Sequence, residues 1–147
     1  MQLFFNINEK ERIVEILISI DPGRAKCGIA VVDRQGTVLF VKAVENSAVV
    51  AELQQIFDKY VLKKVIMGNG TDHINVLTKI KAAYPDLSIE MVDEKNTTLM
   101  ARKLYWQYNT PSFLQSLLPY DWRTTPVLDG YAALAIAIKY IDNVDNI

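Results

Sequence analysis

The sequence predicts one α/β domain built on a mixed five-stranded sheet with helices on both faces. Two observations predict it: three apolar segments of β type follow one another closely before residue 45, and segments of helical and β periodicity then alternate. The chain of 147 residues is 50% hydrophobic and 22% charged, which suits one core of this size. We therefore expect a single domain over residues 1–147, with residues 1–12 as an N-terminal extension.

The first part of the chain predicts three strands, at about 13–20, 28–33 and 37–44. Arg34-Gln35-Gly36 is a short connection that contains glycine, so we expect the second and third strands to form a hairpin. A helix over about 47–60 follows, because its apolar residues recur at helical spacing. These residues are Val49, Val50, Leu53, Ile56, Phe57 and Tyr60.

The rest of the chain alternates between strands and helices. A short buried strand covers residues 65–68, and a helix begins near Asp72. The apolar stripe of that helix consists of Ile74, Leu77, Ile80 and Tyr84. A fifth strand at about 88–92 precedes a third helix, which a threonine of Thr97-Thr98 caps. The final helix covers about 127–141.

Three acidic sites fall where a predicted strand ends or a helix begins: Asp21, the pair Asp93-Glu94, and Asp129. The turn residues Pro22 and Gly23 end the first strand, so Asp21 is held on rigid backbone at a strand end. Positions of this kind can converge on one edge of a sheet. Each acid also has an ordinary explanation, because Asp-Pro-Gly is a common turn and acids are favourable at helix starts.

A cluster of these carboxylates predicts a metal centre. Crowded like charges are unfavourable unless a proton or a divalent cation neutralises them. Oxygen ligands and a phosphate substrate favour Mg²⁺ or Mn²⁺, and the chemistry that such a site supports is phosphodiester hydrolysis. His73 and Cys27, the single histidine and cysteine, predict no competing catalytic centre.

Three motifs resemble known nuclease families. Asp21-Pro22-Gly23 with Gly28 is similar to the first motif of the RuvC-type Holliday junction resolvases. The segment Asp93-Glu94-Lys95-Asn96-Thr97-Thr98 resembles the acidic D-E-R/K-x-T-T/S motif of the YqgF-type (RuvX-type) family, and residues 128–137 resemble the last helix of both. The resemblance covers about residues 16–140. It implies a ribonuclease H-like sheet of order 3-2-1-4-5 and a nuclease for Holliday junction-like DNA or a precursor of small-subunit rRNA.

Two departures favour the YqgF type. RuvC-type enzymes usually carry a glutamate at the end of the fourth strand and a second aspartate one turn into the last helix, where this chain has Gly68 and Ala132. The resemblance thus implies that the second carboxylate comes from Glu94. In a sheet of this order, the tips of strands one and five lie about 9 to 10 Å apart. Glu94 can lean across because Gly68 has no side chain, and Asp93 is the alternative ligand.

A net charge of −1 argues against nucleic-acid binding through bulk charge, so a local basic face is required. Candidate contacts lie near the three motifs, although a solvated surface explains them equally well. They are Arg24, Lys26, Lys95, Thr97, Thr98, Arg102, Lys103 and Arg123. An aromatic group either stacks on unpaired bases or forms core or a homodimer contact. It consists of Tyr105, Trp106, Tyr108, Tyr120 and Trp122.

Two classes of function stay open. The first is a metal-dependent endonuclease, and the second is a nucleic-acid-binding or scaffolding module that keeps the fold without activity. The Asp-x-Gly start is also shared with one half of the actin-like and sugar kinase folds, but one domain of 147 residues lacks the second lobe. The lone Cys27 and the absence of a targeting pattern or long apolar run predict a cytoplasmic protein without a membrane span.

Overall fold

The computed structural model describes residues 15–70, 72–95, 97–109 and 129–145. The expected N-terminal extension, Tyr120, Trp122 and Arg123 lie outside the described residues. The side chains of Thr98, Tyr108 and Asp129 also lie outside the described part, although their backbone positions within helices are given.

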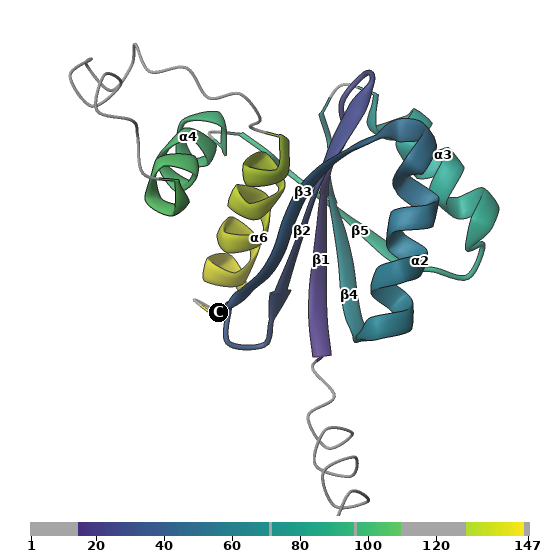
Figure 1. The fold of residues 1–147 in the computed structure, drawn as a ribbon, viewed down its shortest axis with the longest axis horizontal. Coiled ribbons are helices and arrows are strands. Elements are labelled where there is room, and N and C mark those ends of the chain that lie inside the picture. The colour runs from purple at the N-terminus through teal and green to yellow at the C-terminus, as the bar shows by residue number, and fades with distance from the viewer. Residues whose placement is uncertain (1–14, 71, 96, 110–128, 146–147) are drawn as a thin grey trace, which may run out of the picture.

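The described strands form one mixed sheet of order β3-β2-β1-β4-β5, which confirms the expected topology (Figure 1). β1 pairs antiparallel with β2 and parallel with β4; β3 is antiparallel to β2, and β5 is parallel to β4. The strands are β1 (Glu15–Asp21), β2 (Lys26–Asp33), β3 (Val38–Glu45), β4 (Val61–Gly68) and β5 (Ile89–Val92).

Helices cover both faces of the sheet, as expected (Figure 1). A 3₁₀ turn, η1 (Asn46–Ala48), leads into α2 (Val49–Lys59), which lies with α3 (His73–Ala83) on one face. The other face carries α4 (Thr97–Tyr108) and α6 (Asp129–Asp145). None of the helices in the described part is long and apolar enough to cross a membrane.

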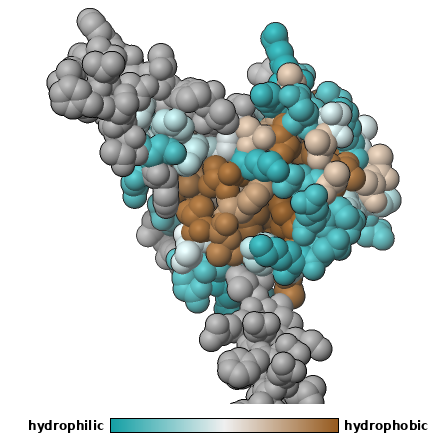
Figure 2. All heavy atoms as spheres, in the orientation of Figure 1, coloured by the Kyte–Doolittle hydropathy of each residue, from teal (hydrophilic) through white to brown (hydrophobic). Residues whose placement is uncertain are grey.

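The alternation of side chains along β1 divides the core into two layers. Ile16, Ile18 and Ile20 are fully buried under α2 and α3. Leu17 packs on the opposite side, in the cluster that α4 and α6 cover. By the same alternation, Asp21 points to the α6 side of the sheet. Figure 2 shows apolar side chains gathered over α6 and β3 on the face seen in Figure 1.

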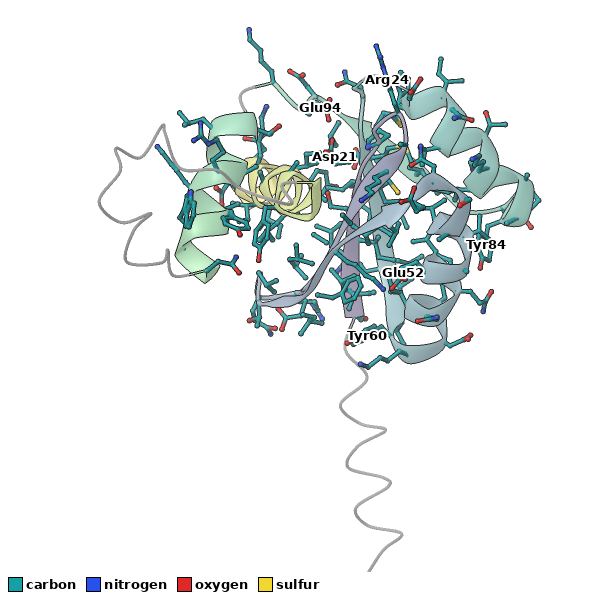
Figure 3. The ribbon with its side chains drawn as sticks, turned by 45° about the horizontal axis from the view of Figure 1, so that its top comes forward. Asp21, Arg24, Glu52, Tyr60, Tyr84 and Glu94 are labelled. Atoms are coloured by element: carbon teal, nitrogen blue, oxygen red, sulfur yellow. The ribbon has the colours of Figure 1, made fainter. Side chains whose placement is uncertain are left out.

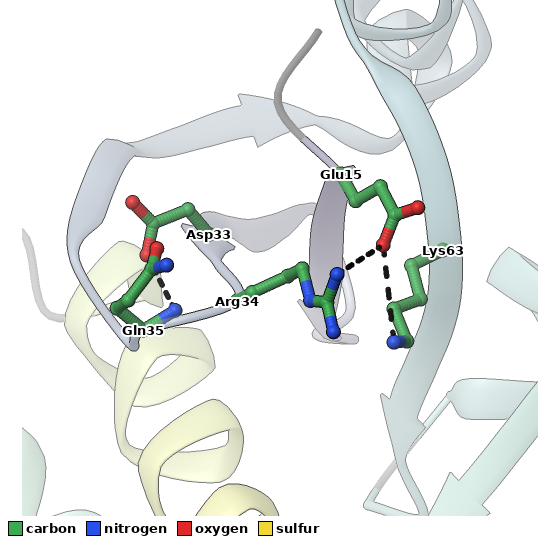
Figure 4. Close-up of polar contacts among 5 residues, drawn as sticks. All are labelled: Glu15, Asp33, Arg34, Gln35 and Lys63. Atoms are coloured by element: carbon green, nitrogen blue, oxygen red, sulfur yellow. Dashed lines mark hydrogen bonds and ion pairs between the residues drawn. The ribbon is translucent and has the colours of Figure 1, made fainter. Parts of the chain in front are cut away.

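The predicted hairpin between β2 and β3 is confirmed. The Asp33 carboxylate accepts hydrogen bonds from the backbone N–H groups of Gln35 and Thr37, both at 2.9 Å. Gly36 has a φ of 82°, a left-handed conformation that glycine adopts without strain. Arg34 forms an ion pair of 3.6 Å with Glu15 at the start of β1 (Figure 4). The hairpin therefore lies at the end of β1 opposite Asp21.

Several expected boundaries and faces differ from the structure. The helix expected over 47–60 is divided into η1 and α2, and Tyr60 has an extended backbone after the helix. β4 begins at Val61 rather than 65, because its exposed first half lacks the apolar run of its buried end. Ile74 is 68% exposed, whereas Val76 is buried. At 100° per residue, Ile74 lies about 200° around α3 from Val76, on the outer face.

Candidate functional site

Asp21 is the last residue of β1, at the point where the strand reaches the edge of the sheet. Ile20 pairs with Met67 of β4, so the next residues, Asp21 and Gly68, end two adjacent strands. Figure 3 shows Asp21, Arg24 and Glu94 at the same end of the molecule, away from Tyr60. The apolar strand thus positions Asp21 at the edge that the sequence predicted.

The loop that follows Asp21 is held by Asn46, which is 6% exposed. The Asn46 side-chain Nδ2 donates hydrogen bonds of 2.9 Å to the carbonyl oxygens of Gly23 and Arg24. The backbone N–H of Asn46 donates to the Ala25 carbonyl, also at 2.9 Å. One buried residue, through its side-chain amide and its backbone N–H, therefore binds three consecutive carbonyls of the loop between Asp21 and β2. The sequence analysis missed this role of Asn46.

The carboxylate of Glu94 lies over the end of β4. A Cβ atom on Gly68 would come within 2.3 Å of Glu94 Oε2 and 2.9 Å of Ile136 Cδ1. A Cβ on Gly70 would lie 1.8 Å from Glu94 Oε1. The structure thus places Glu94 as the crossing argument predicted, on the α6 side of β4. The expected role of Gly68 is met, whereas the sequence analysis missed that Gly70 is equally necessary.

The oxygen Oε2 of Glu94 is the buried end of a residue that is partly exposed as a whole. This atom is buried, and no hydrogen-bond partner among the described residues reaches it. A buried carboxylate oxygen without a partner is unfavourable, and a cation or a proton relieves that cost. Because Gly68 and Gly70 leave the carboxylate its space and Asp21 ends the adjacent strand, the donor set fits a divalent cation with oxygen ligands.

The turn around Glu94 is bound through its backbone. The N–H and the hydroxyl of Thr97 both donate to the Glu94 carbonyl, at 3.2 and 2.6 Å. Thr97 is buried, so it holds the turn and does not face a phosphate, which differs from the expected contact. The exposed Asp93 accepts the Lys95 N–H at 3.0 Å, the local turn bond that remained the alternative explanation for this acid.

The side chain of His73 binds the backbone at Gly70, the second glycine that lies against the Glu94 carboxylate. Its Nδ1 lies 2.8 Å from the Gly70 carbonyl oxygen. A carbonyl can only accept, so Nδ1 carries the hydrogen and donates it. Asp72, immediately before the helix, has a left-handed φ of 64°. His73 is therefore a side chain that shapes the site, a role that its position in the sequence did not reveal.

α6 crosses the sheet obliquely above this edge. At its start, a Cβ on Gly130 would lie 2.7 Å from Val41 Cγ1 of β3, and further along Ile136 contacts the region of Gly68. The helix packs closely on the sheet, since Ala133, Ala135 and Ala137 are fully buried. Asp129 is the first residue of α6, and the part of the chain that the structure describes does not include its side chain.

Among the described side chains, no three acids, histidines or cysteines form a complete metal site. Asp21 and Glu94 are the two expected ligands whose side chains the structure describes, and the third expected ligand, Asp129, lies outside the described side chains.

The expected nucleic-acid contacts and the aromatic group are placed only in part. Arg24, Lys26, Lys95 and Lys103 are exposed, and Arg102 is half-buried. Tyr105 stands edge-on to Trp106 and to Tyr131, with ring centroids 5.0 and 5.4 Å apart. These rings pack against one another between α4 and α6, the core-like alternative that the sequence left open. Tyr131 was missing from the expected group.

Comparison with known proteins finds relatives by sequence and, separately, solved structures that share the fold. No family model matches the chain. It is 33% identical over 97 residues to a protein of Flavobacterium psychrophilum named "Putative pre-16S rRNA nuclease", covering 58% of this chain and 71% of the relative. A protein of the same name from Blochmanniella floridana is 28% identical over 146 residues, covering 90% and 97% of the two chains.

Solved structures share the architecture. Thermus thermophilus RuvC matches with a TM-score of 0.55 and 14% identity, covering 86% of this chain and 96% of RuvC. The same protein in complex with a Holliday junction matches with a TM-score of 0.51. At this identity the likeness shows the ribonuclease H-like fold alone. The family follows from the sequence relatives: this chain belongs to the YqgF-type family, whose curated relatives carry the name pre-16S rRNA nuclease.

Proposed function

We propose that this protein is a metal-dependent endonuclease that hydrolyses phosphodiester bonds in structured nucleic acid. One observation carries the proposal: the buried Oε2 of Glu94, which has no hydrogen-bond partner among the described residues, lies over Gly68, beside the strand that ends in Asp21. The names of the sequence relatives support the same activity.

The proposed ligands are Asp21, Glu94 and Asp129, with Asp93 as the alternative to Glu94. Mg²⁺ or Mn²⁺ held there activates water and stabilises the leaving oxygen. The protein's own contribution is placement. Gly68 and Gly70 admit the Glu94 carboxylate, and Ile136 covers the side on which Oε2 is buried. Burial of Oε2 strengthens the attraction between this oxygen and a bound cation.

We propose that exposed cations around this edge meet the phosphate backbone. Arg24 follows Asp21, and Lys26 begins β2 on the far side of the loop that Asn46 fixes. Lys95 adjoins Glu94 on the opposite side of the site. Arg102, Thr98 and Arg123 remain proposed contacts. Local cations of this kind position a nucleic acid even when the net charge of the chain is only −1.

We propose a precursor of 16S rRNA as the substrate, because both sequence relatives carry that name. Branched DNA is the second candidate substrate, and the shared fold with RuvC does not favour it. We also propose that the sheet and its helices act as one domain in the cytoplasm.

An assay with two substrates and matched variants tests the proposal. The purified chain is incubated with a 16S rRNA precursor and, separately, with a four-way DNA junction, in Mn²⁺, Mg²⁺ or EDTA. We expect RNA cleavage that EDTA abolishes and that Asp21→Asn or Glu94→Gln lowers by more than about 100-fold. Glu90→Gln, an exposed acid on β5, is the control and keeps full activity.

Each other outcome has a defined meaning. Cleavage of the junction alone reassigns the substrate to branched DNA. Metal-independent cleavage, or full activity of Asp21→Asn, contradicts the proposed site. RNA binding without any cleavage supports the scaffolding alternative.

A further inference from the structure

We propose that Lys139 is a positioning residue that sets the place of the Glu94 carboxylate by tying its turn to α6. The inference rests on the proposed function, in which Glu94 is a metal ligand. Among the described residues, the hydrogen bonds of Lys139 go to backbone carbonyls, and in the proposal it does not touch the substrate.

The ammonium of Lys139 binds the carbonyl oxygens of the two residues that flank Glu94. Its Nζ donates a hydrogen bond of 2.9 Å to the Lys95 carbonyl and one of 3.3 Å to the Asp93 carbonyl. The Glu94 carbonyl between them accepts from Thr97. Three consecutive carbonyls are thus bound, so the direction in which the Glu94 side chain leaves the backbone is fixed.

Apart from the hydrogen bonds of Lys139, the turn that carries Glu94 is held by local hydrogen bonds of Thr97 and Lys95 and by the pairing of β5 with β4. β5 has four residues, none of them fully buried, and it is an edge strand of the sheet. A hollow of about 310 Å³ lies between its end and α6, lined by Val92, Asp93, Ile136, Lys139, Tyr140 and Asn143. Apolar packing does not close this gap. The hydrogen bonds of Lys139 reach across it from α6 to the turn.

Because Lys139 lies on α6, its hydrogen bonds connect the Glu94 turn to a helix that also contributes to the candidate site. Ile136 precedes it by three residues, on the same side of the helix, and lies against Glu94 over Gly68. α6 begins at Asp129, the third proposed ligand. By anchoring the turn to this helix, Lys139 sets the placement of Glu94 relative to the element that carries Asp129.

The expected effect is that of a residue that orients a metal ligand. Changes to such residues typically lower metal affinity or activity by about 10- to 100-fold. Lys139→Met keeps the aliphatic chain and removes the donors, whereas Lys139→Arg keeps donors and charge. Lys79→Met, on the exposed side of α3, is the control for loss of one positive charge.

Two measurements on the full chain test the inference. Calorimetric titration with Mn²⁺ is expected to show about tenfold weaker binding for Lys139→Met, substantial recovery for Lys139→Arg and no change for Lys79→Met. In a Glu94→Ala background, Lys139→Met is expected to have no further effect on Mn²⁺ affinity, because it acts through Glu94. Without metal, amide exchange at Lys95 and Thr97 is expected to accelerate in Lys139→Met.

The outcomes separate this inference from the proposed function. If the wild-type chain binds no Mn²⁺, the metal proposal fails and the inference falls with it. If the wild-type chain binds Mn²⁺, Glu94→Ala binds it more weakly and Lys139→Met binds like wild type, only the inference is overturned. An equal loss caused by Lys139→Met with and without Glu94 also overturns it, since it shows a general structural role.

Discussion

The carboxylate of Glu94 occupies the space that a side chain on Gly68 would fill, with Oε2 2.3 Å from the position of a Cβ atom there. The end of β4 therefore presents no side chain of its own and instead leaves room for a carboxylate from beyond β5. This relationship explains how a glycine at a strand end and a glutamate 26 positions later can serve one site.

Gly68→Ala is expected to weaken Mn²⁺ binding by at least about tenfold with little loss of stability. A single methyl group overlaps the Glu94 carboxylate, which is the flexible end of a side chain and can move away at low cost. Among the described glycines, only Gly36 has a positive φ, so alanine at Gly68 introduces no backbone strain. Titration calorimetry and a thermal melt measure the two effects.

The control is Gly36→Ala, in the hairpin at the opposite end of β1. Its φ of 82° makes alanine unfavourable there by about 1 kcal/mol, while open space surrounds the new methyl group. Gly36→Ala should lower the melting temperature and leave the Mn²⁺ affinity unchanged. A Gly68→Ala protein that binds Mn²⁺ like wild type would show that Glu94 does not need this space.

Glu94→Gln is expected to stabilise the metal-free protein by about 1 kcal/mol, or roughly 2–4 °C in melting temperature. The substitution removes a charge from a carboxylate whose Oε2 is buried without a partner among the described residues. Millimolar Mn²⁺ should raise the melting temperature of the wild type and leave that of Glu94→Gln unchanged. A lower melting temperature for metal-free Glu94→Gln would contradict this interpretation.

Asn46→Ala should destabilise the fold by about 1–3 kcal/mol, because it leaves the Gly23 and Arg24 carbonyls without their donor. Asn46→Asp should be more harmful, since a carboxylate facing two carbonyl oxygens repels them. Denaturant unfolding monitored by circular dichroism measures the stabilities of the wild type and of the two variants, and so ranks them. Equal stability of Asn46→Asp and wild type is the result that this hydrogen-bonding scheme excludes.

Lys64 Nζ lies 2.8 Å from Glu90 Oε2, and this ion pair predicts a small, pH-dependent contribution to the free energy of unfolding. Hydrogen bonds with Glu90 and Tyr140 raise the pKa of Lys64 to about 12, and the bond from Lys64 lowers the pKa of Glu90. The stabilisation is thus lost as the pH falls through the lowered pKa of Glu90, or rises toward 12.

Lys64→Met removes the ion pair and so measures its contribution to the free energy of unfolding. Because the two side chains are 42% and 45% exposed, Lys64→Met should lower the free energy of unfolding at pH 7 by less than about 1 kcal/mol. This loss should become smaller in high salt. The cost should also vanish in acid, once Glu90 is protonated. Urea unfolding at several pH values measures it, and a cost that grows in acid would contradict the assignment.

Much of the fold follows from local patterns in the sequence. The apolar run that ends at Asp21, the Gly36 turn and the alternating later elements were sufficient for the sheet and its two helical layers. The outer face of α3 was misassigned at Ile74, because a short helix with apolar residues on several sides has no single clear stripe. The predicted start of β4 was wrong because the exposed residues of the first half of this strand resemble a loop in sequence.

The position of Asp21 at a strand end was predictable from the local sequence pattern. The position of Glu94 over Gly68 was predictable only from the family resemblance together with the strand order that it implies. What the sequence could not reveal are contacts between distant segments. Asn46 binds a loop more than 20 positions earlier, and Lys139 binds a turn 44 positions earlier. Neither lies in a motif, since a donor to a backbone carbonyl imposes no local pattern on the sequence.

The most direct test of the central claim, that Glu94 crosses β4 to hold a divalent metal with Asp21, is Mn²⁺ titration calorimetry on three proteins. Wild type is compared with Glu94→Gln and with Glu90→Gln, which makes the same chemical change four residues earlier on exposed β5. The account predicts equal Mn²⁺ affinity for wild type and Glu90→Gln, and at least about tenfold weaker binding for Glu94→Gln. Unchanged binding in Glu94→Gln, or no binding by the wild type, would contradict it.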